Sequence, residues 1–312
     1  MGSLGSISRV AEGKLKNILT IVAQVFINGL LLGGIYALVS IGLTLIFGVV
    51  RVINFAQGEY LMLGIYGTFW LFDLFGVDPY ISFLLITPLV FIFGLLTQKM
   101  IIRPLLSAPP SALIFATFGL SIVLQNGALL AWKSDPRSIQ TSFSSAVLLL
   151  GGLAINTPRL VIFIATVAIV IGLYFFLNRT YWGKALTAVA QDRIAAQLMG
   201  VDIDKVYLLA FGIGVALEGL AGALLLPIYS AEPTIGTNFC IIAFVVVVLG
   251  GMGNVFGAFL AGLIIGFVEA FSGFFISPQL QGAVYFLIFV VFLIIRPQGL
   301  MGMIGAEEMG HK

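Results

Sequence analysis

The chain has 312 residues, of which 60% are hydrophobic and 9% are charged, with a mean hydropathy of +1.15. So few charged side chains cannot cover the surface of a water-soluble protein of this length, which excludes that class. The net charge of +2 argues against a nucleic-acid-binding surface, and the single cysteine, Cys240, excludes an intramolecular disulfide or a cysteine-rich metal site.

Long charge-free stretches recur along the chain, and each exceeds the roughly 18 apolar residues of a membrane helix. They cover residues 17–50, 104–132, 160–178, 233–268 and 270–295. The sequence therefore predicts an all-α, polytopic transmembrane helical bundle that forms a single domain over residues 1–312, with about 8–10 membrane segments, some of them broken. The expected spans are 18–35, 36–50, 56–75, 80–99, 111–132, 159–178, 206–229, 239–250, 254–276 and 281–296.

Two of these spans are irregular in length. Residues 17–50 would reach roughly 50 Å as one helix, which is long for one membrane pass and short for two. We predict them as two passes, 18–35 and 36–50. Residues 239–250 are too short for a full pass and fit half of a broken helix. The basic N-terminus resembles the front of a signal peptide, but the apolar stretch behind it is too long for a signal core, so it is predicted to remain as the first helix.

The distribution of basic residues predicts the orientation in the membrane. With the N-terminus inside, 12 of the 15 lysines and arginines fall on the inner side and 3 on the outer side, which favours two cytoplasmic termini. The three outer residues are Lys133, Arg137 and Arg159. Lys133 and Arg137 belong to the longest outer loop, 133–158, and Arg159 directly follows it. No strong secondary-structure element is predicted for this loop, and its apolar tail, 146–155, is expected to lie against the membrane.

Two apolar segments are interrupted in a similar way, one near each end of the chain. The first breaks at RVINFAQGE (51–59) and the second at GMGN (251–254). Paired interruptions are typical of the transport pathway in repeat-built transporters, and both also fit simple turns between helices. The candidate residues for a translocation path or gate are Asn54, Gln57, Gly58, Glu59, Gly250, Gly251, Gly253 and Asn254.

Three glutamates lie in or beside apolar stretches: Glu59, Glu218 and Glu269. A charge at the bilayer centre costs about 2.5–3.5 kcal/mol on insertion scales, so such residues are candidates for function. For Glu218 and Glu269 we favour the simpler interpretation, an acid paired with a polar neighbour that fixes helix packing. For Glu59, which is expected at a helix start, the two interpretations are balanced. Glycines four residues apart, such as Gly29 and Gly33 or Gly262 and Gly266, predict seams where helices approach closely.

Residues 179–205 form a long polar, alanine-rich interruption that carries four basic residues. A basic loop between apolar segments is expected in the cytoplasm. Residues 184–198 contain neither glycine nor proline, which predicts a short helix that ends at Gly200. A helix kept on the cytoplasmic face is a candidate docking element for a partner.

The inventory of reactive residues argues against an enzyme. The only histidine is His311, in the polar tail, so neither a Ser–His arrangement nor an HExxH zinc motif can be built. A GxxxxGK[ST] phosphate loop is missing because Asn178 stands where its first glycine would be. We therefore predict no catalytic residue, no metal site and no cofactor in this chain.

Several segments resemble one known family. NGLLLGGIYALVSIGLTLIFGVVRVINFAQGEYLMLGIY (28–66) is similar to the opening of the permeases of branched-chain amino acid ABC importers, in particular the LivH-type subunit. Residues 183–206 resemble that family's cytoplasmic loop, and 248–270 and 296–302 its closing segments. The order and spacing match over nearly the whole chain, and INFAQGE and GGMGN are the more specific motifs.

The resemblance implies a subunit of the bacterial inner (plasma) membrane, with the ABC importer permease fold and no catalysis of its own. A second homologous permease would complete the pore as a heterodimer, two ATP-binding cassette subunits would bind ATP and Mg, and a periplasmic or lipid-anchored solute-binding protein would deliver the solute. Residues 183–200 would then contain the coupling helix that rests on an ATPase subunit. The residues expected to carry this coupling are Gly183, Lys184, Ala188, Asp192, Arg193, Ala195, Ala196 and Gly200.

Two alternatives stay open at this point. The same class of permease could carry urea, short amides or another small solute, because the sequence does not specify the solute. A stand-alone secondary carrier or channel is the alternative from another class. It fits less well, because a coupled carrier usually needs a denser set of buried ionisable groups than three scattered glutamates.

Overall fold

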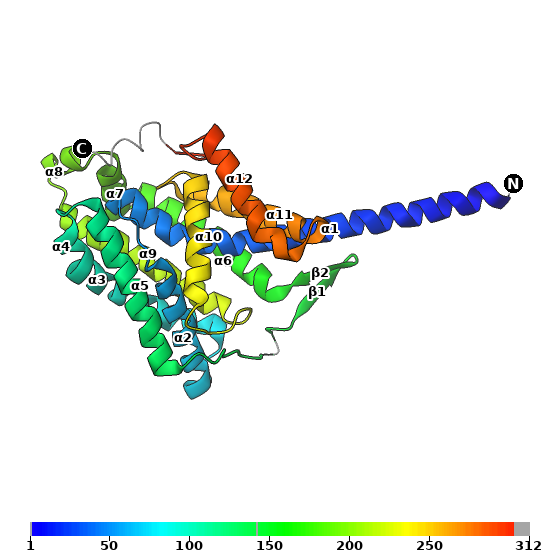
Figure 1. The fold of residues 1–312 in the computed structure, drawn as a ribbon, viewed down its shortest axis with the longest axis horizontal. Coiled ribbons are helices and arrows are strands. Elements are labelled where there is room, and N and C mark those ends of the chain that lie inside the picture. Colours follow the sequence, from blue (N-terminus) through cyan, green and yellow to red (C-terminus); the bar gives the residue numbers. More distant parts are fainter. Residues whose placement is uncertain (1, 142, 303–312) are drawn as a thin grey trace.

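The computed structural model describes residues 2–141 and 143–302, with side chains from residue 17 onward, and its architecture is almost entirely helical (Figure 1). The elements are α1 (Gly2–Val50), α2 (Gln57–Phe75), α3 (Pro79–Thr97), the π-helical η1 (Gln98–Ile102), α4 (Arg103–Leu105), α5 (Pro110–Trp132), β1 (Val147–Leu150), β2 (Leu153–Asn156), α6 (Thr157–Arg179), α7 (Tyr181–Gln191), α8 (Arg193–Leu198), α9 (Ile203–Leu225), α10 (Ile235–Gly250), α11 (Val255–Phe275), the 3₁₀-helical η2 (Pro278–Leu280) and α12 (Gln281–Ile295).

Within the described residues, seven helical stretches are long and apolar enough to cross a membrane. They are Asn17–Val50, Pro79–Leu105, Pro110–Trp132, Thr157–Arg179, Ile203–Leu225, Val255–Phe275 and Pro278–Ile295. The shorter apolar helix α10 and the helix α2 pack among them. The predicted polytopic helical bundle is therefore confirmed.

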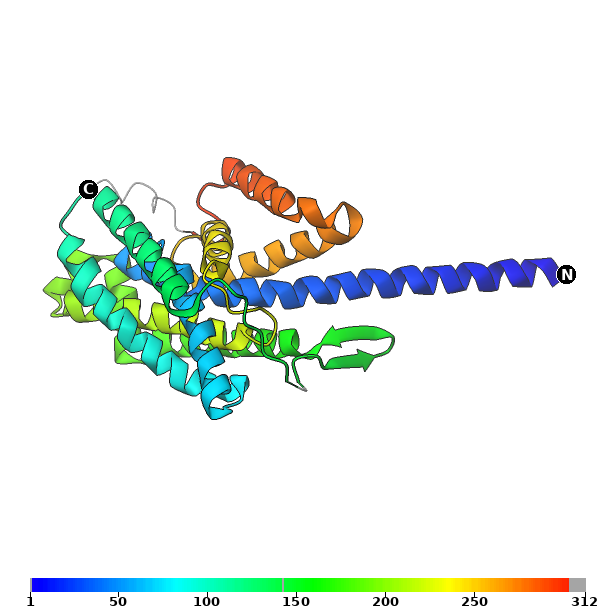
Figure 2. The same ribbon diagram turned by 60° about the horizontal axis from the view of Figure 1, so that its bottom comes forward.

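The first helix differs from the sequence prediction. Residues 18–35 and 36–50 are not two passes, because α1 runs without a break from Gly2 to Val50. Its outer part projects beyond the other helices (Figure 2). Gln24, on this projecting side, bonds to the β1–β2 hairpin, whereas Arg51, just after the other end, bonds to the end of α7. One continuous helix therefore joins the hairpin to the end of α7.

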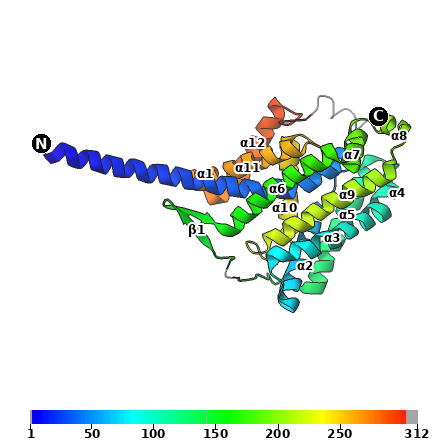
Figure 3. The same cartoon turned by 180° about the vertical axis from the view of Figure 1, so that it is seen from behind.

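The N-terminal end of α1 and the cytoplasmic loop predicted at 179–205 were both expected on the inner side, and their positions in the structure can be compared. The N-terminal end of α1 and the helices α7 and α8 lie at opposite ends of the structure (Figures 1 and 3). The structure therefore separates two segments that the distribution of basic residues had placed on one side. The described chain stops at Gly302, next to the α10–α11 junction, and the last ten residues lie outside the described part.

The seam between α1 and α11 explains why α1 stays continuous. A Cβ at Gly33 would overlap the backbone of Leu263, and one at Gly266 would overlap the backbone of Gly33. The two helices are therefore in backbone contact, as glycine spacing predicted. Dispersion along this contact holds residues 29–37 in register with α11, so the glycines in the middle of α1 serve packing and do not form a turn.

The outer loop also differs from the expectation of an element-free segment. Residues 147–156 form an antiparallel hairpin, in which Val147 pairs with Asn156 and Leu150 with Leu153. Gly151 and Gly152 make its two-residue turn with φ of 58° and 88°, the pair of positive φ angles that a type I′ turn requires. Gln24 of α1 holds the hairpin at Ala154 through two hydrogen bonds of 2.7 and 2.8 Å.

Candidate functional site

Three interruptions of the helical bundle gather at one end of the molecule. They are the α1–α2 junction (51–56), the α10–α11 junction (251–254) and the segment α7–α8. The backbone of Gly48, in the last turn of α1, contacts that of Gly253. The Arg51 guanidinium donates a hydrogen bond of 3.1 Å to the Ala190 carbonyl in α7. We call this region the junction end.

A buried polar chain links the α1–α2 junction to the centre of α9. The Asn54 amide donates to Gln57 Oε1 at 3.0 Å, and Gln57 Nε2 donates to Glu218 Oε1 at 2.8 Å. These three side chains are at most 1% exposed. Because buried polar groups are costly without partners, this chain ties the break to a helix 161 residues away in sequence. Glu218 therefore has a polar partner, as expected for an acid that fixes helix packing.

Glu59 occupies the first turn of α2, as predicted. It is 1% exposed and accepts a hydrogen bond of 3.0 Å from the Ser121 hydroxyl of α5. A carboxylate in the first turn also interacts favourably with the N-terminal dipole of the helix. The structure thus brings Gln57 and Glu59 into the interior, where they fix α2 against α9 and α5.

Gly58 is where α2 and α10 meet. A Cβ at Gly58 would overlap the carbonyl oxygen of Gly236, and a Cβ at Gly236 would collide with the Gly58 backbone. No side chain fits between the two helices here. The close approach of α2 and α10 thus explains why glycine stands at position 58. Beside it, Cys240 of α10 donates a weak hydrogen bond of 3.5 Å to the Phe55 carbonyl.

The second break is a sharp turn closed by the C-terminal tail. Gly251 and Gly253 have φ of 99° and 89°, a region that side chains disfavour. Asn254 caps α11 by accepting from Gly257 N at 2.9 Å, and its amide donates to the Met301 carbonyl at 3.2 Å. Met301 N donates back to the carbonyl of Gly250, at 3.0 Å. The four residues predicted from GGMGN do lie together, at the junction end.

The predicted helix 184–198 is in fact two helices. Asp192 has an extended backbone (φ −147°), which ends α7 at Gln191 and starts α8 at Arg193. Its carboxylate Oδ1 accepts from Ile194 N at 2.9 Å and Ala195 N at 3.0 Å, an N-cap. Gly200, with φ of 84°, follows the end of α8 as predicted.

The residues predicted to couple this segment to a partner divide between two faces. Gly183 and Ala196 are buried against the rest of the chain, and Ala188 is half-buried. Lys184, Asp192, Arg193, Ala195 and Gly200 are exposed. The Arg193 guanidinium lies 5.6 Å from the centre of the Tyr207 ring, which holds α8 close to α9. Gly183 and Ala196 therefore fix the segment to its own bundle and are not available to another protein.

Sequence analysis missed three residues on the outer surface of α8 and its end. Ile194, Leu198 and Met199 are 72, 83 and 84% exposed. Their 194–198 spacing places two of them on one face of the helix. Apolar side chains within an otherwise polar loop, flanked by charges, were the available signal.

The start of α9, at the same end, is fixed by ion pairs. Asp204 pairs with Arg103 across the junction with α4, and the Asp202 carboxylate, the N-cap of α9, pairs with Lys205 at 3.0 Å. Hydrogen bonding from the Lys205 ammonium group lowers the pKa of Asp202. The cap is therefore ionised at neutral pH, where its charge also favours the helix N-terminus.

The buried polar chain gives a direct stability test. In Gln57→Leu, the buried Glu218 carboxylate loses its hydrogen-bond donor, and we expect a loss of about 1–3 kcal/mol of folding free energy. In Gln57→Leu/Glu218→Leu both polar partners are removed, and most of the loss should be recovered. Thermal unfolding in detergent, followed by tryptophan fluorescence, measures both. Asn126→Leu is the control, because Asn126 is exposed and bonds only to the Ile122 carbonyl. A double variant less stable than Gln57→Leu would contradict the pairing.

These features define the class: a polytopic helical membrane protein whose interrupted helices meet beside a surface segment. The family follows from comparison. Residues 25–293 match the family described as "Branched-chain amino acid transport system / permease component", and the chain belongs to it.

Curated relatives agree over nearly the full length. The chain is 32% identical over 299 residues to the high-affinity branched-chain amino acid transport system permease protein BraD of Pseudomonas aeruginosa, covering 92% of this chain and 97% of that one. It is 31% identical over 301 residues to the permease protein LivH of Escherichia coli, with the same coverage of 92% and 97%. A probable LivH of Methanocaldococcus jannaschii is 30% identical over 291 residues, covering 88% and 91%.

Proposed function

We propose that this chain is the membrane-spanning permease subunit of an ATP-driven importer of branched-chain and other hydrophobic amino acids. The observation that carries the proposal is the exposed apolar surface of α8 at the junction end, formed by Ile194, Leu198 and Met199. An apolar surface on a water-facing segment fits a protein partner. In this family's context the partner is an ATP-binding cassette subunit, which would bind ATP and Mg.

The contacts of the junction end supply a route for the motion. A displacement of α7 acts on Arg51 through its bond to Ala190, and hence on the α1–α2 junction. From there the Asn54–Gln57–Glu218 chain reaches α9, and the Gly58–Gly236 contact reaches α10. Because the Asn54–Gln57–Glu218 chain and the Gly58–Gly236 contact are buried and closely packed, they transmit rigid-body movement with little loss. Through these contacts, closure of the two ATPase subunits would shift α2, α9 and α10 together.

The remaining components follow the same proposal. A second, homologous permease completes the pore, as a heterodimer with two ATPase subunits below it. A solute-binding protein outside the membrane makes the first selection of the solute. The support is the family membership and the relatives, whose printed names describe branched-chain amino acid transport.

We further propose that the junction end faces the cytoplasm of a bacterial plasma membrane. Among basic residues with described side chains, eight lie at this end and three at the other. The eight are Arg51, Lys99, Arg103, Arg179, Lys184, Arg193, Lys205 and Arg296. This excess meets the positive-inside rule. The N-terminal end of α1 and the β1–β2 hairpin then lie outside.

Purification and reconstitution test the proposal together. The tagged chain, isolated in mild detergent, should bring ATPase subunits and a second permease with it. Liposomes holding that complex and its binding protein should accumulate radiolabelled L-leucine only with ATP and Mg, and excess unlabelled L-isoleucine should compete while urea should not. Competition by urea would assign another solute. Leucine flux without nucleotide, through liposomes holding this chain alone, would overturn the ATP-driven role.

A further inference from the structure

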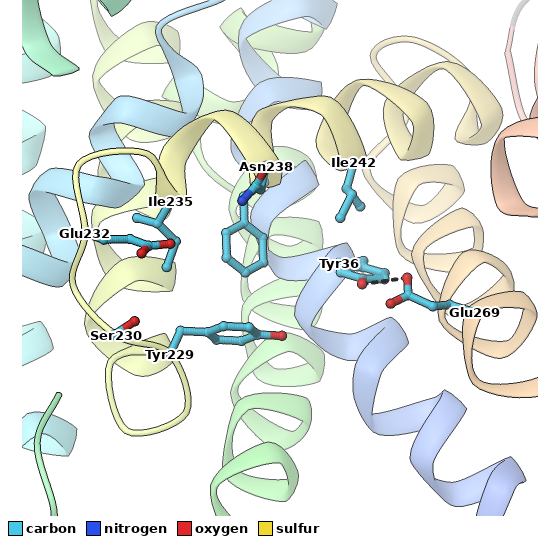
Figure 4. A pocket seen from close by; sticks show the side chains of 9 residues that line it. Tyr36, Tyr229, Ser230, Glu232, Ile235, Asn238, Ile242 and Glu269 are labelled. Atoms are coloured by element: carbon cyan, nitrogen blue, oxygen red, sulfur yellow. Dashed lines mark hydrogen bonds between the residues drawn. The ribbon is translucent and has the colours of Figure 1, made fainter. Parts of the chain in front are cut away.

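A cavity of about 280 Å³ lies between α1, α10, α11 and the α9–α10 connection (Figure 4). Its lining comprises Tyr36, Tyr229, Ser230, Glu232, Ile235, Asn238, Phe239, Ile242 and Glu269. Ligand pockets commonly have volumes of about 300–1,000 Å³, so this one suits a ligand at the small end of that range. None of the residues of the polar chain Asn54–Gln57–Glu218 contributes to it.

One side of the cavity holds a positioned carboxylate. The Tyr36 hydroxyl donates a hydrogen bond of 2.7 Å to Glu269 Oε2, and Tyr36 is only 4% exposed. Since the ring is fixed in the α1–α11 interface, its hydroxyl fixes the carboxylate. Among the hydrogen bonds of the described residues, none engages the second oxygen, Oε1. Glu269 thus has a polar partner, as predicted, and keeps an acceptor for a cationic group.

The opposite wall is apolar and belongs to α10. Ile235, Phe239 and Ile242 follow one another at intervals of four and three residues, so they share one face of the helix. In Figure 4, the labelled Ile235 and Ile242 point from α10 into the cavity. The Tyr229 ring packs edge-on against Phe239, with ring centres 5.2 Å apart and an interplanar angle of 86°. This wall can receive an aliphatic side chain.

The rest of the lining is polar, with a second carboxylate at Glu232 and three side chains that carry hydrogen-bond donors. Tyr229 and Ser230 carry hydroxyls, and Asn238 carries an amide. Ser230 and Tyr229 lie on the side of the cavity away from Glu269, Asn238 lies on α10, and the Tyr229 hydroxyl points toward the middle (Figure 4). A ligand with one cationic end, one group that accepts hydrogen bonds and an aliphatic body fits these contacts. A bare metal ion does not, because the described residues contain no group of three potential metal ligands.

We propose that this cavity is an outer subsite for a zwitterionic aliphatic amino acid, with Glu269 as the acceptor of the α-ammonium group. Tyr36 is a positioning residue that aims the carboxylate. The identity of the ligand rests on the proposed function of the chain. The subsite would select for the ammonium group on the outer side, after delivery and before the solute passes between the helices.

Binding to the full chain, purified into nanodiscs with the subunits that accompany it, tests the subsite. The probes are L-leucine, 3-methylbutylamine, which lacks the carboxylate, and 4-methylpentanoate, which lacks the ammonium group. Ligand-observed NMR titration should show L-leucine and the amine binding and the acid binding at least tenfold more weakly. Glu269→Gln should weaken L-leucine binding about tenfold, because a charge-assisted bond becomes a neutral one. Tyr36→Phe should weaken it less, and Glu269→Asp should retain the preference for the ammonium group.

The control is Asp135→Asn, which removes an exposed acid on the same side of the membrane but outside the cavity. It should leave L-leucine binding unchanged. Equal binding by wild type and Glu269→Gln, or acid and amine binding equally well, would overturn the subsite. If either of these binding results is found while the wild-type complex still takes up leucine with ATP, the subsite is contradicted and the proposed transport function is kept. If uptake is absent but the ammonium preference is seen, the subsite stands and the transport function fails.

Discussion

Asp192→Lys is expected to reduce ATP-dependent leucine uptake to below about one-tenth of wild type while leaving the chain in the membrane. Asp192 supplies the N-cap of α8, and a lysine both removes the acceptor and places a positive charge at the helix start. Loss of such a cap costs about 0.5–2 kcal/mol, which is large for a helix of six residues. The apolar residues of α8 would then no longer be presented as one surface. Uptake into proteoliposomes, normalised to the chain recovered in the membrane fraction, measures the effect.

The matched control is Asp192→Asn. Asparagine caps helices about as well as aspartate, so it keeps the start of α8 and removes only the charge. Most of the uptake should remain. Normal uptake by Asp192→Lys would exclude α8 from coupling, whereas equal losses in both variants would assign the effect to the charge and not to the cap.

The second large effect is expected from Gly58→Val. The new side chain would overlap the Gly236 carbonyl, which belongs to a helix backbone and cannot move aside as a side-chain end can. Separating α2 from α10 would break the contact that closes the first break. We expect a destabilisation of more than about 3 kcal/mol, at the upper end for overpacked sites, and loss of monodisperse protein. Size-exclusion chromatography and thermal unfolding in detergent measure it.

Gly119→Val is the control for that substitution. Gly119 lies within α5, and a Cβ there would have no heavy atom within 4 Å, so the variant should elute and unfold like wild type. Gly236→Val should reproduce the defect of Gly58→Val from the other side of the contact. A stable Gly58→Val protein would show that α2 and α10 do not meet as described.

The bounds of many membrane helices could be predicted from charge-free length. Residues 111–132, 159–178 and 254–276 were expected, and the structure has α5 at 110–132, α6 at 157–179 and α11 at 255–275. Charge and Pro mark both ends of α5 and α6, because charged groups and missing backbone donors are tolerated at helix termini and costly within the bilayer. The two interrupted segments were also found, since glycine and polar residues inside an apolar run leave few alternatives.

The errors have specific physical causes. Residues 17–50 were divided because length alone does not show whether a helix tilts or projects, and the α1–α11 seam that keeps α1 straight is a tertiary feature. The hairpin at 147–156 did carry a local signal, two short apolar runs around Gly151 and Gly152, which was interpreted as a membrane-associated tail. Asp192 inside an alanine-rich run was counted as helical, although aspartate is a strong helix start signal.

The sequence predicted many of the residues of the candidate site, but it did not predict which of these residues contact each other. Gln57 and Glu218 were each suspected, yet their pairing connects residues 161 apart and depends on how α2 and α9 lie against each other. The partner of Glu269 is similarly remote, at Tyr36 on α1. Propensity and periodicity describe single elements, whereas these pairs are decided by packing between elements.

The continuity of α1 has a mechanical consequence. Helix α1 carries Gln24, which is hydrogen-bonded to the β1–β2 hairpin, and it ends next to Arg51, which is hydrogen-bonded to α7. Because a continuous helix is stiff, a tilt at one end of α1 also moves its other end. A displacement of the hairpin is therefore expected to move Arg51 as well, so that α1 couples the two ends of the structure mechanically.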